Sequence, residues 1–488
     1  MTFPAERTGD PPRVARTDRT SSVVILGAGP TGLGTALGLA LHGHQGHVLL
    51  IEKKAAPGGL AGSFRWKNHT VDHGPHRLSP NITRIRVLAE ELLGPDCLIK
   101  KSQHGVQFRG KLYQFPPRVI DWIAPASLWH AAAFAWSFLA AQLAWITWRF
   151  TADTFETTVV RKFGRRFYAR IAAPMAEKVW TDPGEIDPAF VNQRFAQVHP
   201  LEVLKRLLFP KQELNPSIFY YPRRGYQQLW DSIADYLVRE GQTILYESQP
   251  TRLEVERDRI VRLVVADPGG ERTLEGPDLT VVSTLPIASL VGLLAGFDTT
   301  ALREQVGGIK IRSMILVLFE FDLPRALPYR TLIFPERETC FNRLFEQNEY
   351  SRETVAAGRS VVVADVTVPR GDPCLEKSDE DLIAMVRADL AKLPYIRLDR
   401  VTDAAVKRIE FAYVVPDLGT RRRIYHAQHE LKRIANLVLA GRFAVGEYDN
   451  SDYAIDNGIT LGAMLAGRIP KLEYLCRTYD NRQRYIVG

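Results

Sequence analysis

The sequence contains a glycine pattern that suits the binding of a phosphate. Gly27, Gly29 and Gly32 have the spacing G-x-G-x-x-G, and they follow the apolar, β-branched run Val23–Leu26. The first glycine permits a tight turn, the second lets the backbone approach a pyrophosphate, and the third allows a helix to pack closely on a strand. The following residues up to Leu41 are rich in Ala and Leu, which predicts that helix. Its free N–H groups and positive dipole end would face the phosphates.

A carboxylate stands where such a motif needs an acceptor for sugar hydroxyls. The second apolar run, His47–Ile51, ends at Glu52, about 25 residues after Gly27. This order of a strand, a glycine turn, a helix and a second strand that ends in an acid predicts a dinucleotide site. In such a site Glu52 accepts hydrogen bonds from the adenosine ribose.

Two further segments indicate which dinucleotide is bound. Ala56–Gly62 reads A-P-G-G-L-A-G, and Val71–His76 reads V-D-H-G-P-H. The first resembles the loop with which the FAD-containing amine oxidase, protoporphyrinogen oxidase and phytoene desaturase group receives the pyrophosphate a second time. The second resembles the D-x-G-P-H segment of that group and of the UDP-galactopyranose mutases, where it lies close to the isoalloxazine. The resemblance implies FAD as the cofactor.

The resemblance continues to the C-terminal part of the chain. Asn436–Arg442 resembles the strand whose glycine approaches the FAD phosphate, and Tyr453–Ile459 precedes an Ala/Leu/Gly helix whose N-terminus would point at the flavin. The strand Thr243–Tyr246 leads to Pro250, where the backbone of this group meets adenine. The cofactor-binding residues implied are Gly27, Gly29, Pro30, Thr31, Gly32, Glu52, Lys53, Gly58, Gly59, Leu60, Ala61, Gly74, Pro75, His76, Pro250, Gly441, Arg442, Asp456, Gly458 and Ile459.

Candidate catalytic residues are scattered, and the sequence shows no catalytic triad, metal-ligand cluster or covalent-attachment motif. A flavin site often needs no acid–base residue beyond those that bind and tune the ring. His76 belongs to the segment expected near the flavin, where it moves a proton or is structural. Lys178 precedes Val-Trp, as in a segment of protoporphyrinogen-oxidase-like and mutase-like flavoproteins, and contacts a substrate anion or the flavin, or lies at the surface beside a packing tryptophan. We expect His76, Lys178, Arg223, Arg343 and Tyr453 to line the site, and we expect no metal.

Two reactions suit these residues. The first is that of a FAD-dependent oxidoreductase of the oxidase, dehydrogenase or desaturase type, which removes a hydride from a lipophilic or cyclic small molecule and is reoxidised by dioxygen or another acceptor. The alternative is a redox-neutral nucleotide-sugar mutase, similar to UDP-galactopyranose mutase, in which N5 of reduced FAD is the nucleophile. Arginines such as Arg343 would suit its diphosphate. A non-catalytic flavin-binding protein is a third interpretation.

The elements that must position these residues indicate an α/β protein of several bodies, since 488 residues exceed one simple core. We expect a Rossmann-type FAD-binding domain with a parallel sheet that is discontinuous in sequence, an antiparallel-sheet substrate domain and an inserted helical region. Apolar or alternating runs predict antiparallel strands at 312–321 and 360–368, and Ser378 is expected to cap a helix. The expected boundaries are 1–20 for a disordered tail, 21–84, 215–295 and 430–470 for the FAD-binding domain, 85–214 for a mainly helical insertion, and 296–429 for the substrate-binding domain.

Residues 127–150 form an apolar, Trp-rich stretch about as long as a membrane span of roughly 20 residues. His130, Ser137 and Gln142 interrupt the stretch, while its tryptophans favour a membrane interface. A buried core helix, a helix that rests in one leaflet or walls a substrate tunnel, and a true span are three open interpretations.

The composition limits the classes of partner that we expect the protein to bind. The net charge of +8 suits an anionic partner or is merely a basic surface, and no Lys/Arg run with interleaved aromatic residues predicts nucleic-acid binding. The four cysteines are widely separated without a C-x-x-C pair, which argues against a zinc site or a disulfide framework. The first twenty residues lack the apolar core of a signal peptide. We expect a cytoplasmic protein with a small-molecule substrate and, as an alternative, peripheral membrane contact; the oligomeric state is left open.

Overall fold

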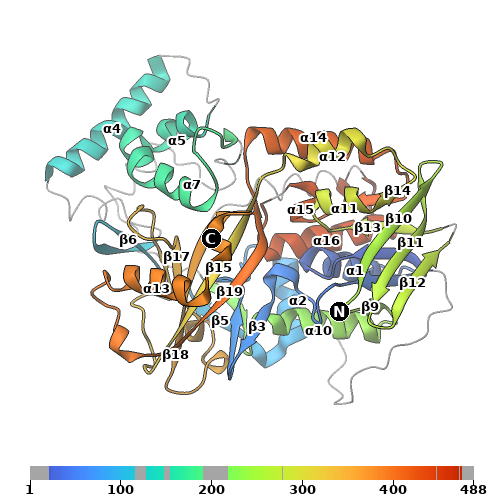
Figure 1. Cartoon of the computed structure of the whole chain (residues 1–488), viewed down its shortest axis with the longest axis horizontal. Helices are drawn as coiled ribbons and strands as arrows, with labels where there is room; N and C mark the ends of the chain where they lie inside the picture. The colour runs from blue at the N-terminus through green and yellow to red at the C-terminus, as the bar shows by residue number, and fades with distance from the viewer. Residues whose placement is uncertain are drawn as a thin grey trace.

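A computed structural model describes residues 21–115, 128–147, 154–188, 190, 218–276, 278–446, 448–471, 473, 474 and 477. Figure 1 shows a body built around a parallel sheet at the right, a long antiparallel sheet near the centre, and a small group of helices at the upper left. The expected tail at residues 1–20 lies outside the described residues.

The parallel sheet has five strands in the order β20-β13-β1-β2-β9. Each neighbouring pair is parallel, as the sequence predicted for the strands beside the first glycine turn. The strands come from widely separated parts of the chain, which confirms a sheet that is discontinuous in sequence. They are β1 (Ser21–Leu26), β2 (His47–Ile51), β9 (Thr243–Leu245), β13 (Thr280–Ser283) and β20 (Leu437–Leu439).

Both faces of this sheet are covered, which explains why its strands read as continuous apolar runs. Val23 and Ile25 of β1 belong to a core with the helices α1, α2, α10 and α16, while Val24 and Leu26 belong to a core on the opposite face. That second core lies under a sheet of order β12-β11-β10-β14 and under the helices α11, α12 and α14. The helices are α1 (Pro30–Leu41), α2 (Thr83–Leu93), α10 (Gln227–Arg239), α11 (Ile287–Leu293), α12 (Thr300–Gly307), α14 (Leu418–Leu431), α15 (Arg442–Val445) and α16 (Ser451–Leu465). The strands are β10 (Gln249–Glu256), β11 (Arg259–Asp267), β12 (Gly270–Glu275) and β14 (Leu294–Ala295).

The helices α1 and α16 pack backbone against backbone through glycines. A Cβ on Gly34 or Gly38 would overlap backbone oxygens of α16, and a Cβ on Gly458 or Gly462 would overlap backbone oxygens of α1. The first and the last helix of the parallel-sheet body therefore approach more closely than any side chain would permit.

The central sheet has seven strands in the order β19-β15-β18-β17-β16-β6-β7. Its pairs are antiparallel except β16 with β6. The predicted strands at 312–321 and 360–368 are confirmed as β15 (Ile311–Phe321) and β18 (Ser360–Pro369), and Ser378 caps α13 (Asp379–Leu390). The remaining strands are β6 (His104–Phe108), β7 (Lys111–Phe115), β16 (Thr331–Ile333), β17 (Arg343–Glu346) and β19 (Val401–Val414).

The described part of residues 85–214 contains three strands besides its helices. Within this range β6 and β7 extend the central sheet, and β5 (Cys97–Lys101) pairs with β8 (Ile218–Pro222). The helical part comprises α4 (Leu128–Thr147), α5 (Phe155–Phe163), α6 (Arg165–Phe167), a π-helical turn Tyr168–Ala172 and α7 (Ala173–Val179). An antiparallel ribbon of β3 (Ser63–Trp66) and β4 (His69–Asp72) completes the strands of the described residues. We propose that the domains have the boundaries expected from the sequence, with the strands β5, β6 and β7 at 97–115.

The helix α4 is not a buried core helix, because Trp136, Leu139 and Leu143 are 70%, 52% and 59% exposed. Within the described part of the chain, no helix is both long and apolar enough to cross a membrane.

Candidate functional site

The first glycine turn joins β1 to α1 with the geometry of a phosphate cradle. Gly27 has a φ of +103°, which favours glycine, and a Cβ on Gly32 would overlap the carbonyl oxygen of Gly27. Gly29 faces open space, since a Cβ there would meet no heavy atom within 4 Å. The N-terminal N–H groups of α1 border this space, which could hold the pyrophosphate of a dinucleotide.

Glu52 ends β2 beside this turn and is only 6% exposed. Its Oε2 accepts the N–H of Ala28 at 2.9 Å, and its Oε1 accepts the N–H of Lys54 at 3.0 Å. The N–H of Ser248 donates to the carbonyl oxygen of Glu52 at 2.9 Å, so the backbone leading to Pro250 runs alongside. An ionised carboxylate has about four acceptor positions, so Glu52 can still accept ribose hydroxyls.

The second glycine turn lies against the first. The N–H of Gly58 donates to the carbonyl oxygen of Ala28 at 2.8 Å. Gly58 and Gly59 both have positive φ, and a Cβ on Gly59 would stand 3.3 Å from the Cα of Gly29. The two turns therefore form one cradle.

The end of β20 closes the cradle from the other side. Gly441 has a φ of +81°, and a Cβ there would stand 3.3 Å from Oγ1 of Thr31 in α1. The next residue, Arg442, donates to the backbone oxygen of Asp449, and its guanidinium lies 5.2 Å from the ring centre of Tyr448. Arg442 thus lies next to the cradle.

The last helix begins earlier than the resemblance implied. Because α16 begins at Ser451, the residues Asp456, Gly458 and Ile459 lie inside the helix rather than at its N-terminus. Gly458 packs on the backbone of α1, and Asp456 forms an ion pair with Arg84 at 2.7 Å. The N–H groups that could face a cofactor belong instead to the turn at Ser451.

His76 is a half-buried ring that is neutral at neutral pH. It stacks on Tyr226 with ring centroids 5.2 Å apart, and its Nδ1 has no hydrogen-bond partner. Burial lowers the pKa of His76 to about 3, and the nearby His73, Arg343 and Arg442 add to this effect. The orphaned nitrogen is available to a bound group.

The segment that contains His76 is fixed by a buried carboxylate. Asp72 is 1% exposed and accepts the hydroxyls of Ser63 and Tyr221, each at 2.6 Å, and the N–H of Tyr226 at 3.2 Å. Burial raises the pKa of Asp72 to about 6 despite these hydrogen bonds. Asp72 was part of the quoted motif, but its positioning role was not expected.

Arg343 projects from β17 next to this segment. Its guanidinium pairs with Asp365 of β18, which is 1% exposed. Burial opposes the charge of Arg343, but the Asp365 carboxylate raises the pKa of the guanidinium above its usual value. The Nε atom of Arg343 is buried without a hydrogen-bond partner.

Two tyrosines that were not expected complete this region. Tyr413 of β19 stacks on Tyr448 with ring centroids 5.4 Å apart and an angle of 9° between the rings. Tyr413 is within electrostatic range of Arg343 and Arg442, as His76 is. We define the arginine–tyrosine cluster as His76, Arg343, Tyr413, Arg442 and Tyr448.

Lys178 has a role different from the expected contact with substrate or flavin. Its ammonium group donates to the backbone oxygens of Phe334, Glu336 and Phe341 at 2.9, 2.5 and 2.9 Å, and to Oγ1 of Thr339 at 3.0 Å. Burial lowers the pKa of Lys178 to about 8. With its donors occupied, Lys178 anchors α7 to the loop 334–341.

Three other expected residues also lie away from the cluster or have other contacts. Arg223 is an ion-pair partner of Asp96 at 3.1 Å and of Glu353 at 2.9 Å at the surface. Tyr453 is buried within α16, and Lys53 is exposed. The C-terminal segment contributes Tyr448 to the cluster, five residues before the tyrosine that the sequence suggested.

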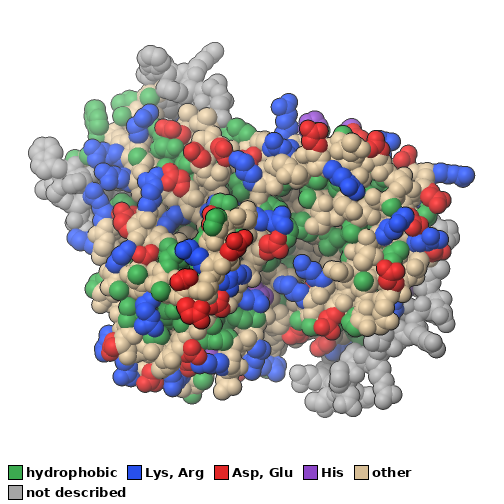
Figure 2. Space-filling view, viewed as in Figure 1, with side chains coloured by type: hydrophobic (Ala, Val, Ile, Leu, Met, Phe, Trp, Pro, Cys, Tyr) green, Lys and Arg blue, Asp and Glu red, His purple; other side chains and the backbone are tan. Residues whose placement is uncertain are grey.

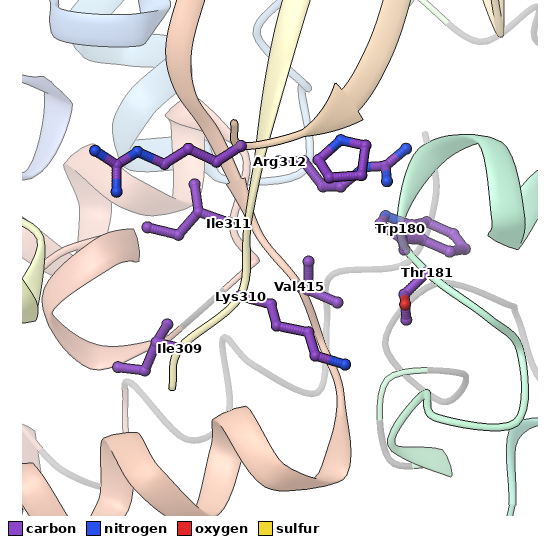
Figure 3. A pocket seen from close by; sticks show the side chains of 9 residues that line it. Trp180, Thr181, Ile309, Lys310, Ile311, Arg312 and Val415 are labelled. Atoms are coloured by element: carbon purple, nitrogen blue, oxygen red, sulfur yellow. The ribbon is translucent and has the colours of Figure 1, made fainter. Parts of the chain in front are cut away.

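A separate pocket of ≈ 310 Å³ lies between the end of α7 and the base of the central sheet. Figure 3 shows Lys310 and Val415 on the side of Trp180 and Thr181, whereas Ile309 and Ile311 point the other way. The residues that line it include none of the expected cofactor or catalytic residues. They are Trp180, Thr181, Ile309, Lys310, Ile311, Arg312, Pro369, Arg370 and Val415.

One family of known proteins matches the N-terminal part of the chain. Residues 25–92 match the NAD(P)-binding Rossmann-like domain family, which covers both glycine turns and Glu52. No curated protein matches the chain.

Solved structures match over nearly the whole chain. Reduced UDP-galactopyranose mutase has a TM-score of 0.80 at 20% identity, with 95% of this chain and 97% of that chain covered. A proposed protoporphyrinogen oxidase from Exiguobacterium sp. 255-15 has a TM-score of 0.68 at 18% identity, covering 92% and 99%. Wild-type putrescine oxidase bound to putrescine has a TM-score of 0.59 at 14% identity, covering 92% and 98%. The chain therefore contains a Rossmann-like nucleotide-binding unit within the fold shared by these three proteins.

Proposed function

We propose that the protein is a FAD-dependent oxidoreductase that removes a hydride from a cyclic or lipophilic small molecule carrying an acidic group. One observation carries the proposal: two glycine turns, Glu52 and Gly441 surround an open space at Gly29, and the arginine–tyrosine cluster adjoins that space. The redox chemistry in this proposal comes from a cofactor rather than from side chains.

The residues present fit FAD. The cradle accommodates a pyrophosphate at Gly29, and Glu52 stands where the ribose hydroxyls need an acceptor. Two buried polar atoms of the arginine–tyrosine cluster, Nδ1 of His76 and Nε of Arg343, have no hydrogen-bond partner. Buried polar groups are nearly always paired, so these two atoms support a bound group at this position.

The cluster supports an anionic substrate. Arg343 and Arg442 are cations, whereas His76 is neutral at neutral pH because its pKa is lowered to about 3. We infer that the arginines hold the acidic group, that His76 acts as a hydrogen-bonding group, and that the stacked Tyr413 and Tyr448 form a flat wall. Bound FAD would supply the hydride acceptor.

A second candidate is a redox-neutral nucleotide-sugar mutase. It is favoured by the TM-score of 0.80 with reduced UDP-galactopyranose mutase, which exceeds the values of 0.68 and 0.59 for the two oxidases compared. The two arginines of the cluster would also suit a diphosphate. Contact between α4 and a membrane surface is a separate proposal with its own test.

Cofactor binding is tested by Gly29→Val. A Cβ there meets no heavy atom within 4 Å, so the flavin-free variant should unfold at the same denaturant concentration as the flavin-free wild type, but the variant should not retain flavin. Gly307→Val is the matched control, because its Cβ also points into open space, and it should keep the flavin. A Gly29→Val protein that retains wild-type flavin would refute the cradle as the binding site.

The reaction is tested by anaerobic titration of the purified holoprotein. The flavin is reduced and then offered dioxygen or a nucleotide sugar, while the visible absorbance of oxidised flavin is followed. Rapid reoxidation by dioxygen without sugar turnover supports the oxidoreductase. Slow reoxidation with turnover of the sugar in the reduced state alone supports the mutase. A protein that contains no flavin and cannot be reconstituted would refute both.

A further inference from the structure

The face of α4 that points away from the protein is apolar. Trp136, Leu139 and Leu143 are 70%, 52% and 59% exposed, and Ala140 between them is exposed as well. In an α-helix with 3.6 residues per turn, positions separated by three, four and seven residues share one side. These four residues therefore form one continuous stripe, which we call the α4 stripe.

Two of the polar residues that interrupt the apolar sequence, Ser137 and Gln142, hold α4 on its neighbours. Oγ of Ser137 accepts the N–H of Arg166 at 3.1 Å, and Nε2 of Gln142 donates to the carbonyl oxygen of Arg161 at 2.9 Å. Gly164 packs so tightly on the backbone at Ser137 that a Cβ there would stand 2.8 Å from its carbonyl oxygen. These contacts fix α4 on α5 and α6 and hold the α4 stripe outward.

Cations surround the elements on which α4 rests. Between residues 154 and 172 the sequence has five cations and one acid, Glu156. Arg165 is 80% exposed, its distance to Glu156 is 4.0 Å, and Arg166 and Arg170 are exposed too. The five cations are Arg161, Lys162, Arg165, Arg166 and Arg170. Figure 2 shows blue and green side chains together at the corner where Figure 1 places α4 and α5.

We propose that the α4 stripe and these cations form a docking surface for an anionic lipid bilayer. An interfacial helix combines an apolar face, tryptophan at the level of the headgroups and basic residues that attract anionic lipids. A second copy of this chain would bring the same excess of positive charge to the surface, so charge complementarity favours lipid. The docking surface is independent of the proposed reaction and would place the enzyme where lipophilic molecules are concentrated.

The test is flotation of the full-length holoprotein with vesicles of phosphatidylcholine alone or of phosphatidylcholine mixed with phosphatidylglycerol. We expect binding to the anionic vesicles, weakened by salt because exposed charges are screened. Trp136→Asp and Leu143→Asp should each lower the affinity at least tenfold, because the new charge must enter the interface. Tyr425→Asp on α14 is the control, since Tyr425 is 63% exposed but lies outside the α4 stripe and the helices around it, and it should bind as wild type.

The electrostatic part is tested separately. Arg165→Glu and Arg166→Glu should each reduce binding to anionic vesicles about fivefold or more at low salt, since each basic residue near such a surface contributes about that factor. Arg239→Glu on α10, an exposed residue outside the helical group, should have no effect. Equal losses in all three variants would mean that net charge alone causes binding and would overturn the docking surface.

Two other results would also overturn the proposal. One is the absence of vesicle binding by the wild-type protein. The other is self-association in analytical ultracentrifugation that Trp136→Asp abolishes while vesicle binding is unchanged, which would make the α4 stripe a contact between protein molecules. Flavin content and flavin reduction, measured on the same samples, report on the proposed function and are expected to be unaffected by every α4 variant.

Discussion

Lys178 offers a sharp test, because sequence and structure give it different roles. If Lys178 contacts substrate, Lys178→Met should impair turnover and leave the fold intact. If it anchors α7 to the loop 334–341, the same change should open that loop. Phe334 and Phe341, whose carbonyl oxygens it holds, are 3% and 0% exposed.

The size of the effect follows from the contacts. An ammonium group has three N–H donors, and each charge-assisted hydrogen bond is worth about 1.5–3 kcal/mol. Burial opposes them and outweighs the nearby acidic groups: the resulting pKa of about 8 instead of 10.5 corresponds to a net penalty of ~3 kcal/mol on the charged amine. The remainder is about 3 kcal/mol in favour of the anchor. Since 1.4 kcal/mol is a factor of ten, local opening should become about a hundredfold more frequent in Lys178→Met.

Hydrogen exchange read by mass spectrometry measures local opening without assuming two-state unfolding of the whole chain. Peptides that cover 334–341 should exchange about a hundredfold faster in Lys178→Met. Lys310→Met is the control, because Lys310 is half exposed and pairs with Glu185 at 2.7 Å, a surface contact worth at most ~1 kcal/mol. Wild-type exchange combined with lost turnover in Lys178→Met would refute the anchor and return Lys178 to the substrate site.

Two further changes probe the buried parts of the fold. Gly462→Ala places a Cβ against the backbone oxygen of Thr35, so it should lower the free energy of unfolding by about 1–3 kcal/mol and weaken flavin retention. Gly307→Ala is the control and should do neither, because its Cβ faces open space. Equal urea midpoints for the two variants would contradict the glycine packing. Burial raises the pKa of Asp72 to about 6 from a usual value of 3.8, so the folded state binds the Asp72 proton more tightly than the unfolded state does. The protonated Asp72 therefore contributes up to ~3 kcal/mol to stability below about pH 4, and this contribution is lost as the pH rises through 6. Asp72→Asn should remove this loss from the difference between urea midpoints measured at pH 4 and pH 7, and a wild-type difference in the variant would assign the effect to another group.

How well the fold could be predicted depended on burial. The strands β1 and β2 have buried residues facing both sides, so they read as continuous apolar runs. The strand β19 was missed because charged residues such as Lys407 and Arg408 interrupt its 14 residues, several of which are partly exposed. The strands β6 and β7 were placed in a mainly helical insertion because they join the central sheet through the pairing of β6 with β16, which lies more than 200 positions later and leaves no local pattern.

The two parts of the candidate site also differ in how well a local sequence pattern could predict them. The glycine turns are local motifs whose spacing carries their geometry, and the structure places the two turns against each other. The arginine–tyrosine cluster is assembled from distant segments, so the sequence suggested His76, Arg343 and Arg442 but missed Tyr413 and Tyr448. Lys178 was noticed for its neighbours in sequence, but the direction of its side chain is set by a loop more than 150 residues later.

The close contact between α1 and α16 has a consequence for biosynthesis. Gly34 and Gly458, which take part in this contact, are about 420 residues apart in the chain. At roughly 5–20 residues per second, the ribosome needs roughly 20–80 s to make the distance between them. Throughout that time the glycine face of α1 lacks the helix that covers it in the finished protein. Because Gly441 closes the cradle, the complete cradle exists only after that residue has been made, close to the end of synthesis.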